Sequence, residues 1–247
     1  MDVNQVQELR QQMAAAGWSP VPLVTGDKAV KIPRWSDLAR QDRNYFAQQP
    51  ARPDMLNTGF LCDGLRVVDI DIDDREYVAH VARLAAKLLG EHPLMRKRSN
   101  SVRLALVYKA AEGAPAKIVV NGKHGKVEIL GRGQQLHAYG LHPSGVEPTW
   151  IPNGPAEVTV DDLQVVADSQ VDLFVREVAA LLEAAEPQLP VERPEPKPVV
   201  STPSRTLSIG YDRQPDGDSL RDALMAIPND SRFDAWDQWN RVGMALW

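Results

Sequence analysis

Three acidic residues alternate with apolar ones in the segment VVDIDIDD, residues 67–74. Side chains alternate across a β-strand, so Asp69, Asp71 and Asp73 would share one face. Carboxylates in such a row repel one another, and a divalent cation that prefers oxygen ligands, such as Mg²⁺ or Mn²⁺, would relieve the repulsion. The alternative is an exposed strand face with solvated acids, although Asp is depleted in strands. The pattern therefore predicts a metal site at Asp69 and Asp71.

A further acid, Glu128, stands between Val127 and Ile129 in the strand-like stretch KVEILG. On a strand its side chain would point away from these two apolar neighbours. Glu128 is thus a candidate third carboxylate for the same metal site. An exposed acid on a strand surface is the simpler alternative.

The segment between these acids is strongly basic. From residue 96 to residue 126, eight Lys and Arg residues stand against a single Glu, whereas the whole chain has a formal net charge of −5. Arg presents a planar pair of donors that can hold a phosphate at two points, and a metal-bound triphosphate needs such counter-charges. Arg96, Arg98 and Arg103 are therefore candidate phosphate ligands, and a solvated basic loop is the alternative.

The remaining reactive residue types give weaker signals. His137 and His142 lie in QQLHAYGLHPSG, a spacing that fits packing in a loop better than a metal pair. Cys62 is the only cysteine, which excludes an internal disulfide and a cysteine-cluster zinc site. Ser101 and Ser144 stand in no recognisable nucleophile context, which argues against a Ser-His-Asp hydrolase.

The elements that must position these residues can be read from the apolar spacing. Residues 3–16 and about 75–89 have helical spacing, and a further helix is expected from Asp161 or Asp162 to about Ala185. Strands are expected on both sides of a hairpin turn at Asp63-Gly64, and in SVRLALVYK, AKIVV, KVEILG and QQLHAYGL, with Asn121-Gly122 as a second hairpin signal. The pattern predicts an α/β (α+β) fold with a mixed or antiparallel sheet flanked by helices.

Composition divides the chain into three parts. Residues 1–185 have the apolar content of a folded domain and are the expected catalytic domain, whereas residues 186–216 are rich in proline and predict an extended linker. Residues 217–247 return to helical spacing and stop within it, which is typical of a truncated helical module. No apolar run is long enough for a signal peptide or a membrane span, so a cytoplasmic location without membrane contact is expected.

Four segments, in this order, resemble the amino-terminal domain of bifunctional primase-polymerases, a branch of the archaeo-eukaryotic primase superfamily. They are GWSPVPL…KIPRW, NTGFLCDGLRVVDIDID, MRKRSNSVRLALVYK and KVEILGRGQQLHAYGLHPSGVEPTW, within about residues 10–160. The resemblance implies that family's catalytic fold and template-directed nucleotidyl transfer from dNTP or NTP on single-stranded DNA. Phages, prophages and plasmids often carry such domains. Residues 217–247 are similar to the start of the helical module that follows them, often ahead of a helicase.

The resemblance also implies a metal-binding role for each acid. Asp69 and Asp71 occupy the family's D-x-D positions, and Glu128 occupies the position of the third acid, so the three would bind the catalytic Mg²⁺ or Mn²⁺ ions. Asp73 has no role in the family pattern.

The family's nucleotide-binding motif, Ser-x-His, corresponds to Ser101-Val102-Arg103. Arg103 would therefore replace the phosphate-binding His, with Ser101, Arg96 and Arg98 completing the nucleotide site. This departure keeps open a catalytically inactive replication-initiation or DNA-docking module. A metal-dependent nuclease that uses the same acids is a further alternative, and it would need no triphosphate pocket.

Overall fold

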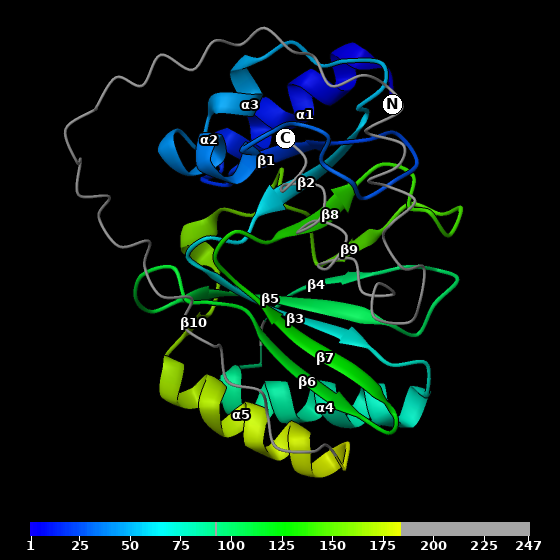
Figure 1. The fold of residues 1–247 in the computed structure, drawn as a ribbon, viewed down its shortest axis with the longest axis vertical. Helices are drawn as coiled ribbons and strands as arrows, with labels where there is room; N and C mark the ends of the chain where they lie inside the picture. The colour runs from blue at the N-terminus through cyan, green and yellow to red at the C-terminus, as the bar shows by residue number, and fades with distance from the viewer. Residues whose placement is uncertain (92, 184–247) are drawn as a thin grey trace, which may run out of the picture. The chain divides into compact units, whose positions relative to one another are not determined.

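The computed structural model describes residues 1–91 and 93–183, which are coloured in Figure 1. The expected linker at 186–216 and the helical module at 217–247 lie outside the described residues, so these two assignments stay predictions. No helix within the described ranges is long and apolar enough to cross a membrane.

The chain alternates helices and short strands from its amino-terminus. In order, the elements are α1 (Val3–Ala15), β1 (Pro20–Leu23), α2 (Trp35–Gln41), α3 (Tyr45–Gln48), β2 (Asn57–Leu61), β3 (Leu65–Asp71), α4 (Arg75–Leu89), β4 (Leu94–Lys97), β5 (Leu104–Ala110), β6 (Ile118–Gly122), β7 (Gly125–Leu130), β8 (Gln135–Tyr139), β9 (Thr149–Ile151), the 3₁₀ turn η1 (Val160–Asp162), β10 (Val165–Val166) and α5 (Asp168–Leu181).

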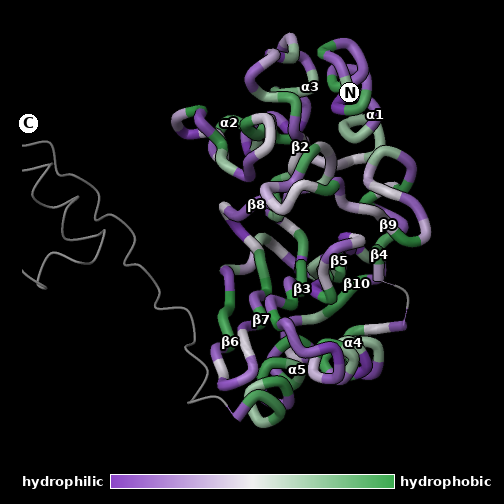
Figure 2. Tube along the Cα trace, turned by 90° about the vertical axis from the view of Figure 1, so that its right-hand side faces the viewer, coloured by the Kyte–Doolittle hydropathy of each residue, from purple (hydrophilic) through white to green (hydrophobic). Residues whose placement is uncertain are grey.

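The larger of two sheets carries the acids. Its strands run in the order β6-β7-β3-β5-β4-β9 with antiparallel neighbours, and the short β10 pairs in parallel with β5. α4 and α5 cover one face (Figure 1), where Val68 and Ile70 of β3 share a core with Val81 and Phe174. Figure 2 shows apolar stretches along these strands and polar residues in the turns. The expected α+β fold, an antiparallel or mixed sheet flanked by helices, is confirmed.

The second sheet lies on the opposite side of β3 from α4 and α5. It has the order β1-β2-β8, is antiparallel, and carries α1, α2 and α3 on the same side of the molecule (Figure 1). A second core joins the sheets, with Val67 of β3 packed among Phe60, Leu136 and Trp18. Because side chains alternate along β3, Asp69 and Asp71 follow Val67 on this same face. The acids therefore face the side of the large sheet on which the small sheet lies.

The two strands around Asp63-Gly64 do not form the expected hairpin. β2 pairs with β1 and β8, whereas β3 pairs with β5 and β7. The turn itself is tight, since the Leu65 amide donates to the Cys62 carbonyl at 3.0 Å, and Gly64 adopts a φ of +75°. All five residues of β2 and the first four of β3 are buried. An isolated two-stranded hairpin cannot bury both faces of its strands. The turn therefore connects a strand of the small sheet to a strand of the large sheet.

The last helix begins later than the sequence predicts. α5 starts at Asp168, and the residues before it form η1 and β10 instead of the helix expected from Asp161 or Asp162. Leu163 and Val166 are buried in two different cores, and β10 pairs with β5. One continuous helix could not place both side chains in these cores, so tertiary packing overrides the local helical spacing.

The second hairpin signal is displaced by two residues. Gly122 pairs with Gly125, so the two-residue loop is Lys123-His124 and Asn121-Gly122 belong to β6. The His124 ring stacks on Tyr77 of α4, with ring centroids 3.8 Å apart. This contact ties the hairpin end to the helix that follows the acidic strand.

The acidic run ends at a helix cap. The Asp74 carboxylate accepts hydrogen bonds from the Glu76 and Tyr77 amides at 2.8 and 3.3 Å, which is the usual role of Asp at an N-cap. α4 then runs to Leu89 and ends at Gly90, whose φ is +126°. Capping fixes where β3 ends and α4 begins, and so fixes which acids remain on the strand.

Candidate active site

The three candidate metal ligands are brought together by strand register. Asp69 lies directly opposite Glu128 of β7 on one side and Ala105 of β5 on the other. Ala105 lies opposite Arg96 of β4. Directly opposed residues share a face, with their Cβ atoms about 4.5–5.5 Å apart. The row Glu128–Asp69–Ala105–Arg96 therefore assembles residues that are far apart in sequence, and Asp71 stands one step along β3 on the same face.

Arg96 reaches Asp69 across the small side chain of Ala105. Its Nη2 atom lies 3.5 Å from Asp69 Oδ1, and its Nη1 donates to the carbonyl oxygen of His137 at 2.8 Å. Arg96 is only 6% exposed. Burial lowers the pKa of Arg96, and the nearby Asp69 carboxylate opposes that shift. Both contacts direct Arg96 to the protein, although the sequence also makes it a candidate phosphate ligand.

Asp69 is the more enclosed of the two aspartates on β3, with a side chain that is 30% exposed against 37% for Asp71. Burial raises the pKa of its carboxyl group, Arg96 works against the rise, and Asp71 and Glu128 add to it. A half-buried carboxylate beside two others is stable in its charged form only with positive partners. Arg96 supplies one such partner from within the protein.

Glu128 is held by two lysines. The Lys117 and Lys126 ammonium groups lie 2.7 and 3.2 Å from Glu128 Oε1, and Lys126 also lies 3.7 Å from Asp71 Oδ2. Burial works to raise the pKa of Glu128, but the two ammonium groups outweigh it and keep the pKa below its ordinary value. Glu128 is therefore an ionised partner in the row and is only 16% exposed at its side chain.

Arg103 is clamped between two aspartates. Its Nε and Nη2 atoms lie 2.7 and 2.8 Å from the two carboxylate oxygens of Asp73, and its Nη1 pairs with Asp71. The Asp73 contact raises the pKa of Arg103, and the Asp71 charge adds to that rise. Ser101 accepts a hydrogen bond from the Arg103 amide at 3.2 Å. Asp73, which shares the alternating acidic pattern but has no role in the family motif, thus fixes the guanidinium beside Asp71.

The oxygen donors of this row suit a hard divalent cation. Asp69, Asp71 and Glu128 offer only carboxylate oxygens from one face of neighbouring strands, which is the donor chemistry of Mg²⁺ and Mn²⁺. Within residues 1–91 and 93–183, however, no three His, Cys, Asp or Glu side chains are arranged to hold a metal ion as they stand. Each acid is instead turned toward a cationic side chain. The residue types fit a metal, and binding one requires the ion pairs to rearrange.

The small sheet contributes two buried histidines near Arg96. His137 lies on β8 and His142 in the loop after it, with ring centroids 5.7 Å apart. Burial, together with the nearby charges of Arg96, Arg98 and Lys28, lowers their pKa values to about 3 and about 4. Both rings are therefore neutral near pH 7. The sequence spacing indicated loop packing for the pair, and gave no sign that they lie beside the acidic row.

Lys28 is a functional candidate that the sequence did not single out. It lies in the turn between β1 and α2, and its carbonyl accepts a hydrogen bond from Gln135 of β8 at 3.0 Å. Burial lowers the pKa of Lys28, with Asp69 as the main opposing charge and Arg96 and Arg98 adding to the shift. An isolated lysine in a loop has no pattern by which sequence reasoning could have found it.

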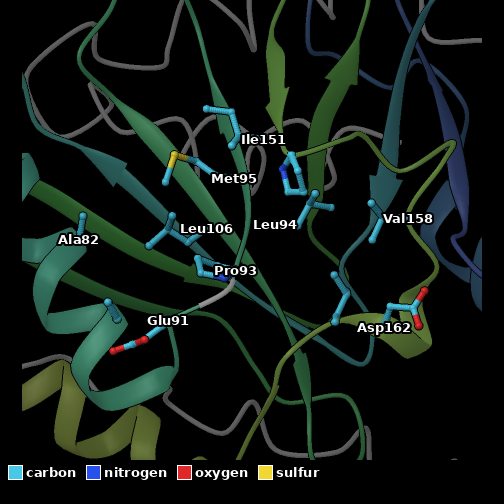
Figure 3. Close-up of a pocket in the computed structure, with 12 residues that line it drawn as sticks. Ala82, Glu91, Pro93, Leu94, Met95, Leu106, Ile151, Val158 and Asp162 are labelled. Atoms are coloured by element: carbon cyan, nitrogen blue, oxygen red, sulfur yellow. The ribbon is translucent and has the colours of Figure 1, made fainter.

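An apolar pocket of about 450 Å³ lies elsewhere, beside α4, β4 and β9 (Figure 3). Leu94, Met95, Ile151 and Val158 are among the apolar residues that line it, and its charged lining residues, Glu91 and Asp162, are both acidic. Such a surface repels phosphate, so this pocket does not match the chemistry of the acidic and basic row.

Comparison with known protein families gives a match for this chain. The family described as bifunctional DNA primase/polymerase, N-terminal (Prim-Pol) matches residues 10–168. The match covers the complete row from Asp69 to Glu128, together with Lys28, His137 and His142. No curated protein matches the chain.

Proposed function

The chain belongs to the bifunctional DNA primase/polymerase family, and we propose that the row of Asp69, Asp71 and Glu128 is its nucleotidyl-transfer site. Membership of this family makes the chain a nucleotidyltransferase domain of DNA replication, with a DNA template and nucleotides as its partners. The observation that supports the site best is the direct opposition of Asp69 and Glu128 across β3 and β7, with Asp71 on the same face. The proposed setting is replication of a phage, prophage or plasmid.

The family is typically metal-dependent, and the three carboxylates would hold two Mg²⁺ or Mn²⁺ ions. The ions would supply charge stabilisation at the attacking and leaving oxygens of the transferred phosphoryl group. Asp69, Asp71 and Glu128 would provide all of the protein's carboxylate ligands. Single-stranded DNA would be the template, and a helicase domain or protein is a proposed further partner.

The surrounding cations have separate tasks in this proposal. Arg96 keeps the enclosed Asp69 ionised from inside the protein, and Lys117 does the same for Glu128. Arg103, fixed by Asp73, would donate its remaining guanidinium N–H groups to the triphosphate. The 3′-hydroxyl oxygen gives up its proton to water and bonds to the α-phosphorus as the bond from the α-phosphorus to the α–β bridging oxygen breaks. Charge then builds on the leaving pyrophosphate, so fixed positive groups there stabilise the transition state.

Primer synthesis on single-stranded DNA with dNTPs or NTPs and Mn²⁺ tests this function. Asp69→Asn and Asp71→Asn should each reduce the rate by at least about 10²-fold, because each removes a ligand charge from the metal site. Asp161→Asn is the matched control, since Asp161 is an exposed acid paired with Lys109, which lies opposite Leu65 at the other end of β3 from the acids. Wild-type rates in both site variants would exclude the row as the catalytic centre.

A nuclease built on the same acids would give a different result. It would cleave the template in the presence of metal and would bind no nucleotide triphosphate. Binding of a dNTP with Mn²⁺ in the absence of DNA therefore separates the two functions. Template cleavage without nucleotide binding would favour the nuclease.

A further inference from the structure

One buried side chain joins two loops beside the acidic row. The Nδ2 atom of Asn57 donates to the carbonyl of Asp27, in the turn between β1 and α2, at 3.0 Å. The same atom donates to the carbonyl of Leu141, in the loop after β8, at 2.7 Å. Asn57 is 1% exposed. The first loop carries Lys28 and the second carries His142, so a single amide fixes the separation of these two residues.

The backbone is shaped to admit this amide. Gly140 has a φ of +92°, and a Cβ atom at this position would lie 2.3 Å from Asn57 Oδ1. Only glycine allows so close an approach in this backbone conformation. Gln135 adds a third link through its hydrogen bond to the Lys28 carbonyl. The turn that bears Lys28 is thus tied to β2 and β8 by side chains of both strands.

The charges around Lys28 are unevenly distributed. Asp69 and Asp71 attract its ammonium group, whereas Arg96 and Arg98 repel it. Among the ion pairs of residues 1–91 and 93–183, none involves Lys28. Arg96 already pairs with Asp69 at 3.5 Å, but a fixed cation such as Lys28 that lacks a close acidic partner raises the local concentration of anions. A phosphate group would relieve the repulsion among Lys28, Arg96 and Arg98.

We propose that Lys28 contacts the triphosphate of the incoming nucleotide from the small-sheet side of the site, and that Asn57 is the positioning residue that holds it there. This inference rests on the proposed function. Phosphate oxygens occur both in the nucleotide and in the DNA backbone. The triphosphate is favoured because the Lys28 turn is hydrogen-bonded to β8, and the His137 carbonyl of this strand holds Arg96 beside Asp69, where the metal ions would carry the nucleotide's phosphates.

Equilibrium titration of a dNTP with Mn²⁺, without DNA, tests the contact directly. Lys28→Gln should weaken nucleotide binding about tenfold, the usual effect of losing one charge-assisted contact, and Lys28→Arg should restore most of it. Lys87→Gln on α4, which packs on the opposite face of the sheet, is the matched control and should bind as the wild type does. Affinity for a single-stranded oligonucleotide should not change in Lys28→Gln.

The outcomes separate this inference from the proposed function. Wild-type nucleotide affinity in Lys28→Gln, in a protein that still makes primers, would overturn the Lys28 contact alone. Weaker oligonucleotide binding with unchanged nucleotide binding would also overturn it, and would assign Lys28 to a template phosphate. A wild-type protein that binds no nucleotide with Mn²⁺ would overturn both proposals.

A double-mutant cycle tests the positioning role of Asn57. Asn57→Ala should weaken nucleotide binding, and adding it to Lys28→Gln should cause little further loss, because both changes remove the same contact. Additive losses, or a lower melting temperature with unchanged nucleotide affinity, would reduce Asn57 to a purely structural residue. Gln135→Ala, which frees only the Lys28 carbonyl, provides a second and milder variant should Asn57→Ala fail to fold. It should show the same non-additivity.

Discussion

The contact between Arg96 and Asp69 gives the sharpest test of how the acidic row is stabilised. Arg96→Met keeps a similar length of apolar side chain and removes the guanidinium. It leaves Asp69 half-buried and without its internal partner, beside Asp71 and Glu128, whose charges already disfavour its ionised form. The variant should therefore lose stability chiefly because a charge is left uncompensated.

The size of the loss can be worked from the burial of the two partners. Breaking a buried ion pair from one side costs about 3–5 kcal/mol. Arg96 and Asp69 are 8% and 30% exposed at their side chains, so the lower end, about 3 kcal/mol, is expected here. In an Asp69→Asn background the same change should cost only about 1 kcal/mol, because the hydrogen bond to the His137 carbonyl is the main remaining loss.

The wild type, Arg96→Met, Asp69→Asn and the double variant form a double-mutant cycle. Urea unfolding at pH 7.5 in the presence of a chelator measures the free energy of unfolding of all four proteins. The coupling should be about 2 kcal/mol, well above the roughly 0.5 kcal/mol expected of independent sites. Arg66→Met is the matched control, since Arg66 is a buried arginine that pairs with Asp168 at 2.7 Å. Asp69→Asn should not rescue Arg66→Met. Additive losses for Arg96→Met and Asp69→Asn would refute the idea that the pair stabilises the row.

Further predictions concern the nucleotide, pH and domain boundaries. Arg103→Ala should raise KM for nucleotide and lower kcat, with Arg103→Lys restoring only part, because an ammonium group cannot copy the two-point contact of a guanidinium; unchanged nucleotide titrations would contradict this. The folded-state pKa of Glu128 is lowered, so its contribution to stability is present above its unfolded pKa and lost as pH falls through its folded pKa. Lys117→Gln should shift this loss to higher pH in acid unfolding curves, and a curve identical to the wild type would count against the pairing. Limited proteolysis should cut first within 187–215 and leave an amino-terminal piece of about 185 residues, a single-domain size; first cuts within 60–150 would contradict the predicted boundaries.

The sequence by itself determined the local arrangement of the acids. A period of two places Asp69 and Asp71 on one face of a strand whatever the strand pairs with, because alternation is a property of the extended backbone. The change to helical spacing after Asp74 and the glycine at position 90 likewise located α4. These are short-range signals, and together with the ordered family segments they were enough for the fold class and the family.

Only the tertiary structure decided which residues meet across strands and sheets. Register between strands that are distant in sequence sets Asp69 opposite Glu128. It also places the small Ala105 side chain between Asp69 and Arg96, so that Arg96 can reach Asp69. The sequence also did not predict that β2 and β3 lie in different sheets. A tight turn such as Asp63-Gly64 has the same sequence signal whether it joins two paired strands or connects two sheets. The turn that bears Lys28 is held by hydrogen bonds from Asn57 of β2 to the Asp27 carbonyl and from Gln135 of β8 to the Lys28 carbonyl. Periodicity describes the neighbours of a residue along the chain, whereas these contacts arise from burying both faces of the large sheet at once.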